Sequence, residues 1–191
     1  MAEFAHEFAE LGARLHGGAG GEAGLLSTTE LAVKHVPGSA WGSITVEDRG
    51  SWRTAAASDP IAQAADELKY KLRQGPCLDA ATEDADQFIS DVLTETRWPA
   101  YTHALAARSP ARSVLGFRLP AERAALNLYA GAPNAFDVES VEIGTVFAAH
   151  VSTALVHFQT RALADNLRVA LDSSRQIGAA IGILMAYHKV T

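Results

Sequence analysis

The chain has 191 residues, of which 48% are hydrophobic and 20% charged, and it carries a formal net charge of −6. This length and composition are typical of a globular protein with one domain of ordinary size and an appendage, and they exclude a disordered chain. The single cysteine, Cys77, excludes an intrachain disulfide and a zinc site built from cysteine pairs.

Neither a leader nor a membrane segment is expected. The first ten residues contain three glutamates and no Lys or Arg, whereas a signal peptide begins with a basic region. The longest apolar run, Ile177 to Tyr187, is far shorter than the roughly 20 residues that cross a bilayer. We therefore expect a cytoplasmic protein.

Charge is unevenly distributed along the chain. Residues 161–191 hold four Lys or Arg against two Asp, and residues 1–160 hold twelve basic side chains against twenty acidic ones. Because an acidic body repels polyanions, a nucleic acid partner would have to meet the C-terminal segment.

The N-terminal region predicts two helices separated by a glycine-rich joint. Apolar residues recur at helical spacing in residues 2–16, and residues 17–24 contain five of the fifteen glycines. Ser27 and Glu30 then have the spacing of a capping box, in which each side chain binds the backbone N–H of the other residue. This pattern predicts a helix that starts at Ser27 and ends near His35.

A β-hairpin and a further helix are predicted next. Residues 41–48 alternate between polar and apolar side chains, and a second extended run follows at 52–57 after the turn signal Arg49-Gly50. Asp59-Pro60 is typical of a helix start with proline at the first helical position. The apolar stripe expected on this helix comprises Ile61, Ala64, Ala65, Leu68 and Leu72.

The rest of the chain predicts more strands and then a long helix. Strands are expected at 87–92, 112–119 and 124–130, with a helix at 99–108 between the first two. From Asp137 onward a helical pattern runs for some fifty residues, whereas globular helices average about 11–12. The fold class is therefore α+β: an antiparallel sheet of five or six strands flanked by helices, followed by a long C-terminal helical stalk.

Three segments resemble GAF sensor domains, in particular those of actinobacterial GAF-ANTAR regulators. They are Gly75-Pro76-Cys77-Leu78-Asp79-Ala80, Arg97-Trp98-Pro99, and Ala125-Leu126-Asn127-Leu128-Tyr129-Ala130 with Pro133 and Phe136. This resemblance spans roughly residues 25–158.

The C-terminal segment is similar to the opening of an ANTAR domain, the RNA-binding antiterminator module. Leu167 to Leu171 and Ser174 to Met185 carry this resemblance, and the second stretch contains the pattern R-x-I-G-x-A-x-G-I-L-M. Ile181 stands where the motif often has Lys, which removes a cation. Only the first of the three ANTAR helices is expected in this chain, so the domain is expected to be truncated.

The two resemblances imply a signal-responsive transcription antitermination regulator, whose ANTAR dimer binds RNA hairpins in a nascent transcript and prevents a terminator from forming. Residues 1–24 would be an N-terminal helix and joint, 25–158 the GAF sensor domain, and 159–191 a linker helix with the first ANTAR helix. RNA is expected as a partner only if the ANTAR domain is completed. The alternative is a stand-alone GAF sensing or dimerisation module that acts on a protein partner.

Two basic residues of the C-terminal segment are candidate RNA contacts: Arg175, which lies inside the motif, and Lys189. A solvated, ion-paired helix face is the alternative interpretation of the arginines. Opposite charges neighbour one another at helical spacings of four and three along Arg161, Asp165, Arg168, Asp172 and Arg175.

An apolar seam with heptad spacing follows the same segment. It comprises Leu163, Leu167, Ala170, Ile177, Ile181 and Leu184. This spacing favours a homodimer through the C-terminal helix, and intramolecular packing is the alternative.

The aromatic residues of the GAF-like region are candidates for a small-molecule pocket, with Asn127 as a polar contact among apolar walls. The candidate pocket residues are Trp41, Tyr70, Phe88, Trp98, Tyr101, Asn127 and Tyr129. Aromatic residues in strands are also ordinary core residues, so a packed core without ligand is the alternative. The pattern does not identify the ligand.

Nothing in the sequence predicts an enzyme. It contains no nucleophile elbow, phosphate-binding glycine loop or dinucleotide-binding motif, and its histidines lack metal-site spacing. Cys77 is expected to be a buried structural residue, because thiol reductase chemistry requires a second thiol. We therefore expect no catalytic residue, no cofactor and no metal.

Overall fold

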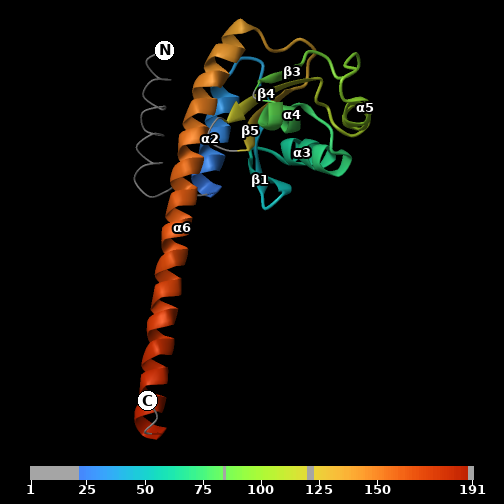
Figure 1. Cartoon of the computed structure of the whole chain (residues 1–191). Helices are drawn as coiled ribbons and strands as arrows, with labels where there is room; N and C mark the ends of the chain where they lie inside the picture. The colour runs from blue at the N-terminus through green and yellow to red at the C-terminus, as the bar shows by residue number, and fades with distance from the viewer. Residues whose placement is uncertain (1–21, 84, 120–122, 189–191) are drawn as a thin grey trace, which may run out of the picture. The chain divides into compact units, whose positions relative to one another are not determined.

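The computed structural model describes residues 22–83, 85–119 and 123–188 (Figure 1). Its contacts divide the chain into two compact units, with the division between Val156 and His157. The helix expected at 2–16 and most of the glycine-rich joint lie outside the described residues.

Within the described residues, the first unit contains one sheet of five strands in the order β2-β1-β5-β4-β3. The strands are β1 (Trp41–Asp48), β2 (Ser51–Ala57), β3 (Gln87–Ile89), β4 (Ser113–Leu119) and β5 (Ala124–Ala130). Neighbouring strands pair antiparallel throughout, which confirms the predicted fold class. β3 covers only the first three residues of the strand predicted at 87–92.

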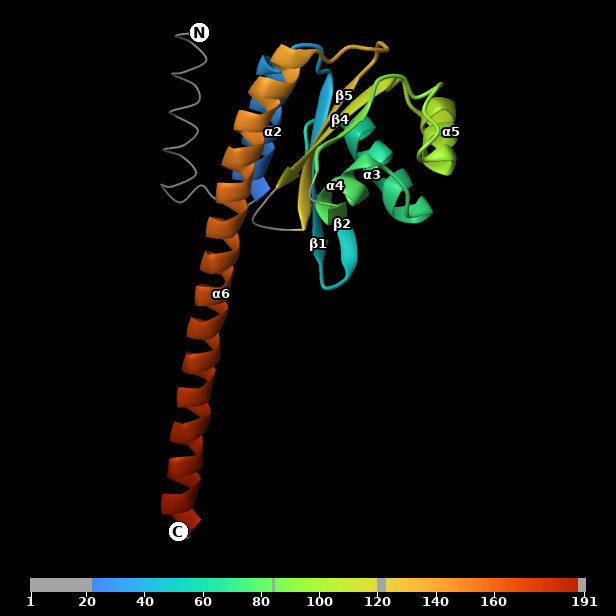
Figure 2. The same ribbon diagram turned by 45° about the horizontal axis from the view of Figure 1, so that its top comes forward.

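Helices cover both faces of this sheet (Figure 2). One face carries α2 (Glu22–His35) and the first part of α6 (Val138–His188). The other carries α3 (Pro60–Leu72), α4 (Pro76–Glu83) and α5 (Pro99–Arg108). Two layers of core result, and the central strands contribute side chains to both.

The alternation of β5 distributes its residues between these layers. Leu126 and Leu128 belong to the apolar core shared with α2 and α6. Since successive side chains of a strand point to opposite faces, Asn127 and Tyr129 point to the side of α3, α4 and α5. The interior polar groups described below all lie on this second side.

The hairpin predicted from the sequence is confirmed. Asp48 pairs with Ser51, and the two residues between them have positive φ, 51° at Arg49 and 83° at Gly50. Two consecutive positive φ values are the requirement of a type I′ turn, whose twist matches that of the strands it connects.

The predicted helix start at Ser27, with Glu30 completing a capping box, is wrong. α2 begins at Glu22, because Leu25 is buried in the core and holds the preceding turn against the sheet. The two threonines that follow Ser27 have hydroxyl groups that donate to backbone carbonyl oxygens four residues earlier, each at 2.8 Å. Such bonds suit a helix interior, so this hydroxyl-rich segment continues a helix instead of starting one.

The ends of α3 follow their local signals. Asp59 is the N-cap, as predicted, and its Oδ1 accepts a hydrogen bond of 2.7 Å from the backbone N–H of Ile61. At the other end Arg73 adopts the left-handed conformation, with φ 52°, and its backbone N–H donates to the carbonyl oxygen of Lys69. This is the usual geometry of a helix C-terminus, here without glycine.

The buried face of α3 differs from the stripe predicted for it. Ala62, Ala65, Asp66 and Lys69 are the buried positions, whereas Ala64 of the predicted stripe is exposed. The pattern fails because an acidic and a basic side chain, which normally face solvent, lie inside and satisfy each other.

α4 is an element that the sequence analysis did not predict. It has only eight residues and begins at Pro76, directly after Gly75, and a Gly-Pro pair indicates the end of a helix more readily than the start of one. α5 occupies the predicted range, and proline stands at its first helical position.

α6 confirms the long helix predicted from Asp137 onward, and Asp137 caps it by accepting a 2.9 Å hydrogen bond from the backbone N–H of Ser140. Phe147 and Val151 are buried in the core with the sheet. A methyl group added at Gly144 would overlap the ring of Phe117, so glycine allows the helix to approach the sheet there.

Candidate ligand-binding site

A buried ion pair lies at the centre of the first unit. Lys69 Nζ is 2.8 Å from Asp66 Oδ1, the two residues are one helical turn apart on α3, and both side chains are 0% exposed. Burial by itself would lower the pKa of Lys69, but the charge of Asp66 holds that pKa well above its usual value. The two side chains therefore form an ion pair inside the domain.

Hydroxyl groups from the sheet supply the other hydrogen bonds of Asp66. Tyr129 of β5 donates to Oδ1 at 2.6 Å, and Thr54 of β2 donates to Oδ2 at 2.9 Å. Thr45 of β1 reaches the same Oδ2 at a longer 3.4 Å. Three strands thus hold one carboxylate, which is what a buried charge requires.

Two further polar atoms in this interior have no hydrogen-bond partner among the described residues: Tyr101 Oη and Asn127 Oδ1. Both side chains are completely buried. The amide nitrogen of Asn127, in contrast, donates to Ser43 Oγ at 3.2 Å and to Thr45 Oγ1 at 2.9 Å. The layer between the sheet and α3–α5 therefore buries a group of polar side chains beside its apolar cluster.

Cys77 lies in the same interior, at the start of α4, and is fully buried as the sequence predicts. Burial raises the pKa of its thiol above the ordinary value, although the nearby Lys69 opposes the change. A buried thiol with a raised pKa is a weak nucleophile.

A surface groove of about 590 Å³ lies beside this interior. It is lined by Gly50, Ser51, Trp52, Tyr70, Arg73, Leu78 and Asp79. The β1–β2 turn, the end of α3 and the start of α4 supply these residues. This volume falls in the range of roughly 300–1,000 Å³ found for small-molecule sites.

Tyr70 connects the groove to the buried ion pair. Its ring lines the groove, and its hydroxyl donates to Thr45 Oγ1 at 3.1 Å and lies 2.9 Å from Thr54 Oγ1. Both threonines in turn contact Asp66. A molecule that moves Tyr70 would therefore disturb the bonds that hold the buried carboxylate.

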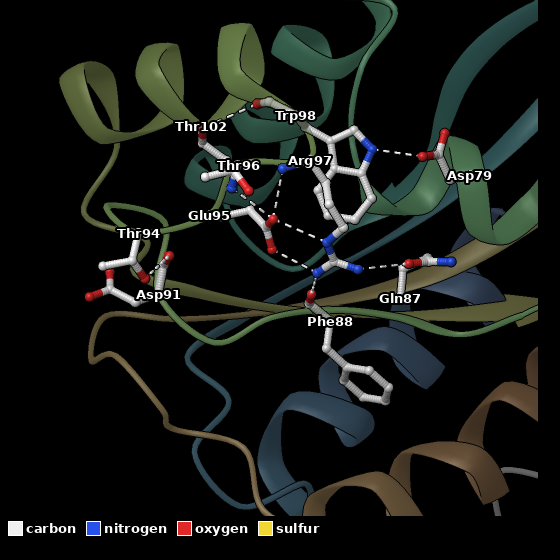
Figure 3. A network of polar contacts seen from close by, with 10 residues as sticks. All are labelled: Asp79, Gln87, Phe88, Asp91, Thr94, Glu95, Thr96, Arg97, Trp98 and Thr102. Atoms are coloured by element: carbon white, nitrogen blue, oxygen red, sulfur yellow. Dashed lines mark hydrogen bonds and ion pairs between the residues drawn. The ribbon is translucent and has the colours of Figure 1, made fainter.

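The loop before α5 is fixed by the guanidinium group of Arg97 (Figure 3). Arg97 bonds Glu95 with Nε at 3.0 Å and with Nη2 at 2.6 Å, donates to Gln87 Oε1 at 3.1 Å, and donates to the backbone carbonyl of Phe88. Its guanidinium also lies over the ring of Trp98, 4.3 Å from the ring centre.

Trp98 extends this network to the groove. Its indole Nε1 donates to Asp79 Oδ2 at 2.7 Å (Figure 3). Asp79 lines the groove, so the Arg97-Trp98-Pro99 segment supports one wall of it from behind.

The predicted pocket residues are dispersed in the structure. Only Tyr70 lines the groove. Trp98, Tyr101 and Tyr129 are buried in the core beneath α3 and α5, Trp41 packs against that core, and Asn127 belongs to the buried polar layer.

Phe88, the remaining predicted pocket residue, lies at a different place. It lines a smaller hollow of about 150 Å³ on the β3 side of the sheet. The binding roles of the seven residues stay predictions, because placement alone does not assign them.

Sequence reasoning missed several residues that build the groove and the interior: Thr45, Trp52, Thr54, Asp66, Lys69 and Arg73. Asp66 and Lys69 follow the helical spacing of buried positions on α3, but their charges argue for solvent. Trp52 lies near the start of β2 and Arg73 is the C-cap of α3. The direction of a side chain at such positions cannot be predicted from the sequence pattern. The one signal in the sequence for a buried ion pair was the i, i+3 spacing of Asp66 and Lys69.

The second unit contributes the described side chains of residues 157, 160 and 163–177, all on α6 and all exposed. Arg175 pairs with Asp172 at 3.8 Å, and Arg168 pairs with Asp165 at 3.5 Å, with the arginines about 80% exposed. Lys189 lies outside the described residues.

The seam residues of α6 are exposed as far as they are described. Leu163, Leu167 and Ile177 are 56–61% exposed, and Ala170 is exposed as well. The side chains of Ile181 and Leu184 lie outside the described part of the chain. Exposed apolar side chains at this spacing are typical of a helix that packs against a partner.

Neither a metal site nor a membrane span is found in the described part of the chain. Within residues 22–83, 85–119 and 123–188, no group of three or more His, Cys, Asp or Glu side chains could hold a metal ion. No helix in the same ranges has the length and hydropathy needed to cross a bilayer.

The fold is similar to several solved structures. The GAF domain of a phosphoenolpyruvate-protein phosphotransferase from Coxiella burnetii matches with a TM-score of 0.63 and 11% identity, over 84% of this chain and 96% of that one. The phycoerythrobilin-bound GAF domain of a cyanobacterial phytochrome matches with a TM-score of 0.59 and 12% identity, over 83% and 97%.

An enzyme is also among the similar structures. A type II free methionine-R-sulfoxide reductase from Thermoplasma acidophilum matches with a TM-score of 0.56 and 15% identity, over 70% of this chain and 90% of that one. Neither the family models nor the curated proteins compared with the chain match it. Identities this low establish the fold alone, and the chain contains a domain with the GAF fold.

Proposed function

We propose that the chain is a signal-responsive transcription antitermination regulator, in which the GAF-fold unit senses a small molecule and the C-terminal segment belongs to an RNA-binding ANTAR domain. The observation that carries this proposal is α6, one helix from Val138 to His188. Its first part is built into the core of the first unit, and its last part carries the ANTAR-like motif. A change in the sensor core thus has a direct covalent route to the motif.

The groove is the proposed sensing site, acting by binding and without turnover. It is open to solvent on one side, and on the other Tyr70 and two threonines connect it to the buried Asp66. Displacement of Tyr70 would change the hydrogen bonds of Thr45 and Thr54, which in turn contact the carboxylate of Asp66. The buried thiol of Cys77, with its raised pKa, supports a role in packing.

The proposed RNA contacts are Arg175 and Lys189. Arg175 lies inside the ANTAR-like motif and its guanidinium is exposed, so it can exchange its ion pair with Asp172 for a phosphate group. The expected partner is an RNA hairpin bound by a completed ANTAR domain.

A homodimer through α6 is part of the proposal. The exposed seam at Leu163, Leu167, Ala170 and Ile177 would be covered by the same seam of a second copy, while the paired charges of the opposite stripe stay in solvent. Two ANTAR segments would then face two hairpins.

An electrophoretic shift with a two-hairpin RNA tests the proposal. We expect weak binding by this chain and tight, hairpin-specific binding by a chain extended to a full ANTAR domain. In the extended chain, Arg175→Gln should weaken binding and lower the salt dependence by roughly one phosphate contact. Arg168→Gln is the matched control, since Arg168 has the same kind of ion pair and lies in the first ANTAR-like stretch but outside the R-x-I-G pattern that contains Arg175. Equal effects of the two variants would contradict the assignment of Arg175.

The second candidate is a stand-alone sensing or dimerisation module that acts on a protein partner. The ion pair between Arg175 and Asp172 favours it, because the paired arginine belongs to a neutralised helix face. If the extended chain fails to shift the RNA while a dimer still forms through α6, this second function replaces the first.

A further inference from the structure

The first part of α6 has an exposed side as well as a buried one. Its buried side packs on the sheet, with Phe147 and Val151 in the core (Figure 2). Between residues 146 and 156 the exposed positions of the helix are Val146, Ala149, Thr153 and Val156. The two valines are 44% and 40% exposed. These four residues form a stripe on the first unit, called the sensor stripe below.

The sensor stripe carries no charged side chain. The solvent-facing positions of a surface helix normally hold charged or strongly polar residues, whereas this stripe holds two valines, one alanine and one threonine. The hydroxyl of Thr153 donates to the backbone carbonyl oxygen of Ala149 at 3.0 Å. Because this bond satisfies the hydroxyl within the helix, the methyl group of Thr153 remains for packing.

The sensor stripe has the spacing of the apolar seam proposed for the second unit. Its positions are separated by three, four and three residues, and the same alternation continues through Thr160 into that seam. The positions of this continuous series that the structure describes are Val146, Ala149, Thr153, Val156, Thr160, Leu163, Leu167, Ala170, Ser174 and Ile177. All ten side chains are exposed.

The length of this series indicates what covers the sensor stripe. Leu163 to Ile177 span only two heptads, and a coiled coil requires a pattern sustained over about three to four. With its start at Val146 the series spans more than four heptads. A second copy of the chain offers a helix with the same period in the same phase, which makes the surface complementary to itself.

We propose that the α6 helices of two copies pair in parallel and in register from Val146 to Ile177, so that the second copy covers the sensor stripe. In this register each residue of the series faces its own counterpart. Parallel pairing brings the two ANTAR-like segments to the same end of the dimer. The inference rests on the proposed function, whose dimer contact it extends from the second unit onto the first.

This contact would couple the sensor core to the dimer. Val146 of the stripe is followed directly by Phe147 and Ala148, which are buried against the sheet. The same turns of α6 therefore pack in the core on one side and on the partner on the other. A rearrangement of the core that shifts these turns would change the dimer contact without passing through a linker.

Cysteine cross-linking of the full chain tests the register. Ala149→Cys should be joined into a covalent dimer by a short bis-maleimide, because position 149 of one copy faces position 149 of the other. Ala64→Cys is the matched control: Ala64 is also an exposed helix alanine of the first unit, but it lies on α3, on the other face of the sheet. The native Cys77 is buried and should not react.

A chain that is dimeric by light scattering but does not cross-link through Ala149→Cys would overturn the proposal. Cross-linking of Ala64→Cys to the same extent would overturn it as well, since random collisions would then explain both results.

A charge placed in the sensor stripe tests its contribution to dimer affinity. Ala149→Glu should raise the dimer dissociation constant at least about tenfold, because it sets two like charges opposite each other. Ala64→Glu should leave this constant unchanged, and far-UV circular dichroism of both variants checks the fold. If folded Ala149→Glu dimerises as tightly as the unchanged chain, the dimer contact is confined to the second unit and the proposal is wrong.

The RNA shift separates this inference from the function beneath it. If the extended chain binds the two-hairpin RNA but Ala149→Cys does not cross-link, the sensor stripe is not a dimer contact and the regulator stands. If Ala149→Cys cross-links as expected and the RNA does not bind, the extended dimer contact is confirmed and the antitermination function is contradicted.

Discussion

At the scale of single residues, the most informative feature is a charged pair placed where the sequence pattern expects apolar side chains. Asp66 and Lys69 are completely buried, and their mutual attraction is supplemented by hydroxyl donors from three strands. Charged pairs of this kind stabilise the fold little compared with apolar residues, but removal of one partner leaves an uncompensated charge. Their position beside the groove connects the stability of the fold with the proposed sensing site.

Lys69→Met should lower the free energy of unfolding by about 3–5 kcal/mol, because Asp66 would stay buried without its counter-charge. Urea unfolding at neutral pH measures the loss. Lys71→Met, on the exposed side of the same helix, is the control and should change stability by less than about 0.5 kcal/mol. Equal losses in the two variants would show that the ion pair has no special role.

The free energy of unfolding should fall as the pH rises above about 10, the ordinary pKa of tyrosine. Burial raises the pKa of Tyr70 and Tyr101, so the folded chain keeps phenol protons that the unfolded chain releases. Their contribution is complete below pH 10 and is lost above it, and the raised pKa of Lys69 acts in the same direction.

Urea unfolding at pH 8 and pH 11 checks this dependence. Tyr70→Phe should show a smaller decrease between the two pH values than the unchanged chain, because one titrating phenol is gone. A stability that is flat or rises over this interval would contradict the burial of ionisable groups in the first unit.

At the scale of helices and strands, the close approach of α6 to the sheet depends on Gly144. Gly144→Ala should destabilise the fold by about 1–3 kcal/mol, because the added methyl group overlaps the ring of Phe117. Helix propensity alone predicts the opposite, a gain of about 1 kcal/mol.

Thermal or urea unfolding distinguishes these signs. In a Phe117→Leu background the smaller side chain should reduce the loss caused by Gly144→Ala, since the two substitutions share one space. A stabilising Gly144→Ala would show that α6 does not pack on β4 as described.

Much of the fold was predictable from local signals. β4, β5 and α5 follow the hydrophobic period and the proline at a helix start, and the hairpin follows its turn residues. The start of α2 could not be predicted from these signals, because the burial of Leu25 extends the helix to residues before the capping pattern at Ser27. The short α4 was hidden because its first residues are those of a turn.

The candidate site was less predictable than the fold. Its aromatic members were chosen for residue type, but only Tyr70 lines the groove. Tyr129 on β5, and Trp98 and Tyr101 at the start of α5, are buried in the core, and Phe88 lines another hollow. Arg73 and Trp52 reach it through a helix cap and a strand end, whose directions depend on tertiary structure. Residue type therefore located the candidate site in the GAF-like region, but it did not identify the side chains that line the groove.

At the scale of the whole molecule, the GAF-fold unit is continuous with a long helix, α6, that carries an exposed apolar seam. The seam side chains that the structure describes, Leu163, Leu167, Ala170 and Ile177, are exposed, and Val169 and Leu171 are exposed beside them. Exposed apolar side chains at this spacing are typical of a helix that packs against a partner, and the proposed partner is a second copy of the chain.

Light scattering should show a dimer at micromolar concentration for the unchanged chain. Leu167→Glu should give a monomer, because it places a charge inside the seam. Val169→Glu is the matched control: Val169 is 67% exposed, Leu167 is 56% exposed, and Val169 lies outside the seam, so this variant should stay dimeric. If the unchanged chain is a monomer, the proposed dimer contact through the seam is contradicted.

We propose that this GAF-fold unit controls an antiterminator. The most direct measurement is transcription in vitro through a terminator preceded by two hairpins, with the chain extended to a full ANTAR domain. We predict increased read-through with the extended chain, a loss of that increase in Leu167→Glu, and retention of it in Val169→Glu. Read-through that stays at the level without protein, although the protein is folded and dimeric, would contradict the claim.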